Sequence, residues 1–236
     1  MAPKISVIVP AINEEKYIMN LFQGLSDQTF KDFEVIVVDG GSKDRTVEIA
    51  KKNNAKVIME KKKGIGIARN TGAAKSRGSI LVFLDADTKP SRNLLKTYNE
   101  VFEKDEDIVA ATGPIYPLEK TNKRILLGYK IVSIFFVKLS IMLGVPSVVG
   151  SNFSARRSPF MKIHGFNPKL LTYEDWDLSI RIRNLGRIVY DNNASVQTSV
   201  RRVAAWGIFG YFRYHFGNML RYYFLKKTKE DYGEIR

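Results

Sequence analysis

Two aspartates, Asp85 and Asp87, follow the apolar run at residues 80–84 and are separated by a single alanine. Such a run predicts a buried strand, so both carboxylates are expected at its exposed end. Two carboxylates at this spacing can reach one ion through a turn, and hard oxygen ligands suit Mg²⁺ or Mn²⁺ rather than zinc. The same triplet also occurs in ordinary surface turns, so its meaning depends on the surrounding sequence. We expect a divalent cation here, with Asp87 as the first choice of direct ligand and Asp85 as the second.

The composition limits the chemistry that the chain can perform. Its 236 residues are 44% hydrophobic, which is enough for one sizeable core. There is no cysteine and only two histidines, so disulfides and thiolate catalysis are excluded and metal chemistry must rest on carboxylates. A formal net charge of +14 calls for an anionic partner: nucleic acid, a phosphate-bearing substrate or lipid headgroups. The first residues lack the apolar stretch of a signal peptide, which favours a cytoplasmic location.

Short β-branched runs alternate with polar helical stretches in the first half of the chain. This alternation predicts an α/β fold, a mostly parallel sheet with helical crossovers. Strands are expected at residues 5–9, 33–39, 56–59 and 80–85, and helices near residues 14–26, 43–53, 66–77 and 91–103. Ligands bind such sheets beyond the carboxyl ends of the strands, which directs attention to the stretches 10–15, 39–42 and 85–88.

Six motifs occur along the chain in an order that is characteristic of one family. They occupy residues 8–15, 37–46, 66–72, 85–87, 150–157 and 173–178. Together they resemble the inverting nucleotide-sugar glycosyltransferases of family 2, which have the Rossmann-like GT-A fold. The resemblance implies metal-dependent transfer of one sugar from a UDP- or GDP-sugar to a hydroxyl or phosphate acceptor, with Mn²⁺ or Mg²⁺ as cofactor. An inverting transfer needs a general base, and by resemblance this is Asp175. Alternatively, Glu174, Asp175 and Asp177 only complement the dipole of the helix that they begin.

The remaining site residues are expected to contact the nucleotide-sugar donor. They are Pro10, Asn13, Glu14, Asp39, Arg69, Asp85, Asn152, Arg201 and Arg202. Asp39 can accept hydrogen bonds from a base or a ribose, or it can form the turn before Gly40. Ser42 is expected to cap the helix that follows. Arg201 and Arg202 suit a diphosphate clamp, with ordinary basic surface as the alternative. They stand where processive members have Gln-x-x-Arg-Trp, which favours transfer of a single sugar.

Residues 1–110 are predicted to form the nucleotide-sugar-binding half, and two apolar segments follow it in the chain. The first, 125–145, lies in the acceptor half (111–200), and its two lysines argue against a membrane span because each costs about 2.5–3.5 kcal/mol at the bilayer centre. The second, 201–236, is a basic aromatic appendage with eight Lys or Arg against three Asp or Glu. Both are predicted to form amphipathic helices at the inner face of the cell membrane, which favours a lipid-linked or membrane-proximal glycan acceptor. Alternatively, they pack on the sheet, on each other or on a second copy.

Other classes of protein fit less well. A nucleic-acid-binding protein would explain the charge, but the aromatic stripe has helical spacing and no such binding motif accompanies it. A sugar nucleotidyltransferase shares the fold and the acids, but the Gly-rich, arginine-bearing opening loop is absent. A non-catalytic membrane protein would not need both the Asp85–Asp87 pair and Asp175.

Overall fold

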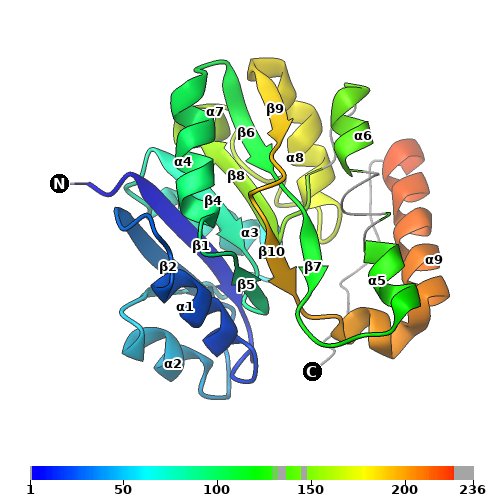
Figure 1. Cartoon of the computed structure of the whole chain (residues 1–236), viewed down its shortest axis with the longest axis horizontal. Coiled ribbons are helices and arrows are strands. Elements are labelled where there is room, and N and C mark those ends of the chain that lie inside the picture. Colours follow the sequence, from blue (N-terminus) through cyan, green and yellow to red (C-terminus); the bar gives the residue numbers. More distant parts are fainter. Residues whose placement is uncertain (1, 130, 132–136, 145–147, 226–236) are drawn as a thin grey trace.

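The computed structural model describes residues 2–129, 131, 137–144 and 148–225. Seven strands form its central sheet: β1 (Ile5–Ala11), β2 (Phe33–Asp39), β3 (Lys56–Met59), β4 (Ile80–Leu84), β6 (Ile108–Thr112), β8 (Asn152–Arg156) and β9 (Arg187–Tyr190). Their spatial order is β3-β2-β1-β4-β8-β6-β9 (Figure 1). Only β8 runs antiparallel to its two neighbours, and the other pairs are parallel. The predicted α/β class, with a mostly parallel sheet, is confirmed.

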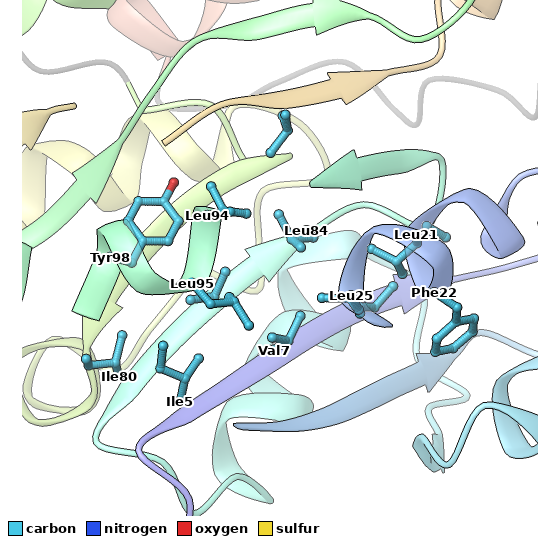
Figure 2. Close-up of a cluster of buried hydrophobic side chains, with 14 of the residues drawn as sticks. Ile5, Val7, Leu21, Phe22, Leu25, Ile80, Leu84, Leu94, Leu95 and Tyr98 are labelled. Atoms are coloured by element: carbon cyan, nitrogen blue, oxygen red, sulfur yellow. The ribbon is translucent and has the colours of Figure 1, made fainter. Parts of the chain in front are cut away.

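Helices cover both faces of this sheet. On one face lie α1 (Ile18–Ser26) and α4 (Leu94–Lys104), with α2 (Thr46–Lys52) beside α1. On the other lie α3 (Ile65–Ala74), α7 (Arg157–Lys162) and α8 (Glu174–Ile182), which a 3₁₀ turn at Arg183–Leu185 extends. Figure 2 shows Leu21 and Leu25 of α1 and Leu94 of α4 packed over the central strands. Strand β4 contributes alternate side chains to each layer, so all its residues are buried. This double burial explains why its sequence is apolar throughout rather than alternating.

A second sheet, which was not predicted from the sequence and which we call the small sheet, joins three short strands. They are β5 (Thr88–Pro90), β7 (Ile115–Pro117) and β10 (Val196–Thr198), in the order β5-β10-β7. Strand β5 begins directly after Asp87, so this sheet extends from the edge where the acids lie. Its strands have three residues each and come from distant parts of the chain, which leaves little local periodicity to detect.

The first two helices begin later than the sequence predicted. Helix α1 starts at Ile18 because the preceding backbone amides bind the neighbouring loop instead of a helical turn: Glu14 N donates to Thr46 Oγ1 at 2.7 Å and Glu15 N to Asp44 Oδ2 at 3.1 Å. Helix α2 starts at Thr46, and Ser42 does not cap it. The predicted cap was therefore wrong, since Ser42 and the residues up to Thr46 instead hydrogen-bond the loop that follows β1.

Three helices form one side of the molecule. They are α5 (Lys123–Tyr129), α6 (Val137–Met142) and α9 (Arg201–Leu225), which lie together on the side remote from α2 (Figure 1). Gly207 interrupts α9 with φ 68° and ψ 161°. The helix predicted over 125–145 falls partly on residues outside the described ranges, as do residues 226–236 of the appendage. None of the helices within those ranges combines the length and the apolar character that crossing a membrane requires.

Candidate functional site

The carboxyl ends of β1, β2 and β4 meet at one edge of the central sheet. Ala11 is opposite Asp39 in the register of β1 with β2, and β4 lies on the other side of β1 and ends immediately before Asp85. Pro10 is half-buried near the end of β1. The predicted donor-binding stretches therefore converge on this edge, as expected for parallel strands.

Asp39 organises the turn after β2. Its carboxylate has no exposed surface and accepts hydrogen bonds from Gly41 N at 2.8 Å, Ser42 N at 2.9 Å and Ser42 Oγ. Asn13 fixes the same loop, because its amide oxygen accepts from Lys43 N and its backbone N donates to Ser42 Oγ. Of the two roles expected for Asp39, its position favours turn formation. A contact with the donor remains a prediction for both Asp39 and Asn13.

Arg69 is buried inside the protein. Its side chain is 2% exposed, and its guanidinium donates to Glu174 Oε1 at 2.7 Å and to Asp85 Oδ1 at 2.8 Å. Gly150 closes the space around it, since a Cβ there would lie 2.6 Å from the terminal guanidinium nitrogens. This position differs from the donor contact expected for Arg69: both arms of the guanidinium are occupied by carboxylates of the protein. Arg69 instead links the end of β4 to the start of α8.

Asp87 is held at the same edge by a residue from α9. Its carboxylate is 16% exposed and lies 3.2 Å from the Arg201 guanidinium, while Thr198 Oγ1 donates to Asp87 Oδ1 at 3.4 Å. Burial and the neighbouring charge of Asp85 raise the pKa of Asp87 to about 7, and Arg201 and Arg202 oppose this shift. The raised pKa means that the surroundings of Asp87 destabilise its charged form, and a further cation would stabilise that form.

Arg201 also binds the opening loop. Its guanidinium donates to both carboxylate oxygens of Glu14, at 2.8 and 2.5 Å, and lies 4.7 Å from the ring centroid of Tyr17. Such bidentate pairing fixes the orientation of the guanidinium plane. The structure thus gathers Glu14, Asp87 and Arg201, three of the predicted site residues, and Arg202 is half-buried beside them.

The predicted base lies at the start of α8. Asp175 is half-buried and accepts hydrogen bonds from Gly150 N at 3.0 Å and Trp176 N at 2.8 Å. Burial raises the pKa of Asp175, while Arg69 and these amide hydrogen bonds oppose the shift. The neighbouring Glu174 has a pKa raised to about 7 by burial and by Asp175, against the influence of Arg69. A carboxylate with a raised pKa and a hydrogen-bonded orientation is suited to accept a proton.

Asn152 has no exposed surface. Its side chain accepts from Tyr98 Oη at 2.6 Å and donates to Ala194 O at 2.8 Å and to Pro114 O at 3.4 Å. These bonds join β8 to α4 and to the residues shortly before β7 and β10. The expected contact between Asn152 and the donor gains no support from this position.

Two contacts of this region were not anticipated. Asp177 accepts from Tyr222 Oη at 2.9 Å and so joins α8 to α9, and Glu119 binds Ser199 Oγ at 2.6 Å and Val200 N at 2.9 Å at the start of α9. No sequence pattern pairs these residues, because the partners are far apart in the chain.

The oxygen ligands at this edge fit a hard divalent cation. Asp85 and Asp87 supply two carboxylates, and no group of three or more acidic or histidine side chains poised for a metal occurs among the described residues. Mg²⁺ typically keeps one or two protein carboxylates and fills its remaining positions with water and substrate phosphates. The two carboxylates, Asp85 and Asp87, therefore match the number that such a site takes from a protein.

The fold is the GT-A fold of glycosyltransferases. A mannosyltransferase from Pyrobaculum calidifontis, solved with GDP-Man and Mn²⁺, is similar over 92% of this chain and 65% of its own, with a TM-score of 0.67 and 20% identity. Staphylococcus aureus TarS residues 1–349, solved with UDP-GlcNAc, is similar over 83% of this chain and 58% of its own, with a TM-score of 0.65 and 22% identity. At these identities the likeness shows the fold alone.

Sequence comparison identifies the family. Residues 6–164 match the model of glycosyl transferase family 2, and the chain belongs to this family. The probable glycosyltransferase YdaM of Bacillus subtilis is 30% identical over 200 residues, which are 78% of this chain and 47% of the relative. An uncharacterized glycosyltransferase of Haemophilus influenzae is 30% identical over 196 residues, 75% of this chain and 61% of the relative. The chain therefore spans about half to three fifths of the length of these relatives.

Proposed function

We propose that the chain transfers one sugar from a nucleotide-diphosphate sugar to an acceptor hydroxyl with inversion at the anomeric carbon. The bond between that carbon and the phosphate oxygen breaks, and a bond to the acceptor oxygen forms. The acceptor proton passes to Asp175, and the nucleoside diphosphate leaves with the bonding electrons. Family membership favours this reaction over the synthesis of sugar nucleotides.

The observation that carries the proposal is the link made by Arg69. It binds Asp85 at the end of β4 and Glu174 next to Asp175, so the carboxylates expected to face the leaving group and the acceptor are fixed relative to one another. A transfer reaction needs these groups held in one geometry, because misplacement by about 1 Å can cost 10²-fold in rate.

Asp85 and Asp87 are proposed to hold Mn²⁺ or Mg²⁺. The bound ion would act as a Lewis acid that stabilises the charge of the departing diphosphate. In the absence of other cations, Arg69 and Arg201 balance these carboxylates. The presence of Mn²⁺ with GDP-Man in the Pyrobaculum mannosyltransferase supports the proposal. Arg201 and Arg202 remain candidates for contact with the diphosphate.

Donor turnover without the natural acceptor tests this function. Water can replace the acceptor, so UDP-GlcNAc and GDP-mannose are incubated with the protein and Mn²⁺, and release of the nucleoside diphosphate is followed. Proton NMR then shows which anomer forms first. An inverted anomer supports the proposal, whereas a retained anomer contradicts the role of Asp175 as a base.

Replacing Asp87 by alanine is expected to abolish metal-dependent donor binding, since a principal oxygen ligand is lost. In wild-type protein the preferred nucleoside diphosphate with Mn²⁺ should raise the melting temperature, because ligand binding favours the folded state. Asp87→Ala should remove this shift, and Asp27→Ala, at an exposed position at the end of α1, should preserve it. An undiminished shift in Asp87→Ala would place the ion elsewhere.

A peripheral membrane location is the second part of the proposal. Seven large exposed apolar side chains lie on or shortly after α5 and α6 and at the end of α9: Leu126, Leu127, Ile131, Leu139, Met142, Leu143 and Phe224. We call these residues the apolar helical face. The sequence has no acidic residue between Glu119 and Glu174 or between Asp191 and Glu230, and Lys123, Lys138, Arg213 and Arg221 are exposed. Exposed apolar side chains on segments that carry cations and no acids suit the anionic surface of a cytoplasmic leaflet. This location favours a lipid-linked or membrane-proximal glycan as the acceptor.

Placing charge on the apolar helical face is expected to release the protein from membranes. Leu127→Glu, Met142→Glu and Phe224→Glu combined should lower binding to vesicles of phosphatidylserine and phosphatidylcholine at least about tenfold, since each loses apolar contact and adds repulsion. The control is Met19→Glu, Met59→Glu and Met161→Glu combined, which makes the same change in net charge at exposed methionines elsewhere. Sedimentation with vesicles measures both. Equal loss in the two variants would show that net charge alone decides binding.

A further inference from the structure

A cavity of about 860 Å³ lies between the end of α1 and the small sheet. It is separate from the acidic edge, by which we mean the sheet edge that carries Asp85 and Asp87. Its walls come from residues 24–31, from β5 and the residues after it, and from β10 and β7. This volume is within the range of pockets that hold small ligands. We call it the basic pocket, for the side chains described next. It contains none of the residues assigned to the transfer reaction.

The floor of the basic pocket is a row of three side chains. Gln197 of β10 is opposite Lys89 of β5 and opposite Tyr116 of β7, so the three project from the same face of the small sheet. All three line the pocket. Their neighbours Val196 and Ile115 are buried against the core from the other face. The row thus combines a cation, an amide and an aromatic ring on one accessible surface.

The charge of the pocket is positive. Lys31, Lys89 and Arg92 line it, against the single acid Asp27. Lys31 Nζ donates to Ser26 O and Lys89 Nζ to Gln23 Oε1, both neutral oxygens. None of the ion pairs found among the described residues includes these three cations. Their charges are therefore free to attract an anion.

Strand β10 connects the pocket with the sheet edge that carries Asp85 and Asp87. Strand β10 runs from the pocket at Val196 to Thr198, whose hydroxyl lies 3.4 Å from Asp87 Oδ1. Two strand residues span on the order of 7 Å. Because the side chains of Gln197 and Thr198 point to opposite faces of this sheet, a chain of a few sugars in the pocket would reach the acids by passing the edge of the sheet.

We propose that the basic pocket binds an anionic stretch of glycan, carrying carboxylates or phosphates, that belongs to the acceptor. This assignment as acceptor rests on the proposed function. The cations pair with the acidic groups, Gln197 bonds sugar hydroxyls, and the ring of Tyr116 packs against a sugar face. The pocket thereby selects acidic glycans over neutral ones of the same length.

The test measures binding without turnover, by isothermal titration calorimetry. The probes are the hexasaccharide of galacturonic acid, neutral maltohexaose and inorganic tripolyphosphate. We expect the acidic hexasaccharide to bind at least about tenfold more tightly than either of the others. Comparable binding of maltohexaose would overturn the charge assignment, and comparable binding of tripolyphosphate would overturn the glycan assignment.

Two charge-reversal variants locate the binding. Lys31→Glu with Arg92→Glu should weaken hexasaccharide binding roughly tenfold or more. Lys51→Glu with Lys75→Glu makes the same change in net charge at exposed positions on α2 and after α3, and should change binding less than about twofold. Equal weakening in both variants, or none in the first, would overturn the proposal. Donor binding with Mn²⁺ should be unaffected in both, so a protein that binds the hexasaccharide but no donor would contradict only the proposed function.

Discussion

Replacing Asp175 by asparagine is expected to lower the rate of sugar transfer by roughly 10²–10⁴-fold while donor binding is retained. The asparagine oxygen can still accept the hydrogen bond that Gly150 N donates to the carboxylate. It cannot accept the acceptor proton at neutral pH. The loss should therefore fall on kcat, with the melting-temperature shift produced by the donor and Mn²⁺ unchanged.

The matched control for this experiment is Asp177→Asn in the same helical turn. Asp177 bonds Arg181 at 2.7 Å and Tyr222, so the variant removes a first-turn charge from α8 without touching the proposed base. If both variants lost activity equally, the acids would act through the helix dipole rather than through proton transfer. Near wild-type transfer by Asp175→Asn would rule out this residue as the base.

Replacing Arg69 by methionine is expected to destabilise the protein by about 3–5 kcal/mol, because it leaves the buried Glu174 and the half-buried Asp85 without their partner. Both carboxylates, Asp85 and Glu174, bind its guanidinium, and its side chain is 2% exposed. The control is Arg77→Met, which removes an exposed arginine from Glu34 and should cost at most about 1 kcal/mol. Urea unfolding measures both. Equal costs would contradict the structural role of Arg69.

The deficit of Arg69→Met should also depend on pH. The pKa of Glu174 is already raised to about 7 from an ordinary value of 4.5, and loss of Arg69 raises it further. Between the unfolded and the folded pKa the native state holds a proton that the unfolded state releases, so stability falls as pH rises. The deficit is therefore expected to be larger at pH 8 than at pH 5.5. A deficit independent of pH would show that Glu174 does not titrate in this range.

The sequence alone revealed the features that depend on local pattern. The strands at residues 33–39 and 56–59 have the predicted bounds, and the acids of residues 85–87 follow a buried strand as expected. These predictions succeed because hydrophobic periodicity and strand-end acids are encoded within a few neighbouring residues. The family resemblance rests on the same short segments, and the family comparison confirms it.

The contacts that organise the site depend on residues far apart in the chain. Arg69 meets Glu174 across 105 positions, and Arg201 meets Glu14 across 187. No local pattern reports such pairings, so Arg69 was expected to bind the donor rather than carboxylates of the protein. Asn152 shows the same limit, because its residue type suits a ligand contact and only the fold reveals its burial.

Thermal unfolding with UDP, GDP, dTDP, CMP and ATP, each with and without Mn²⁺, tests most directly whether this chain binds a nucleotide-sugar donor through a metal. The proposed function predicts that one nucleoside diphosphate raises the melting temperature and that the increase requires the ion. A shift that is independent of Mn²⁺, or the absence of any shift alongside binding to vesicles, would contradict it and indicate a binding role instead.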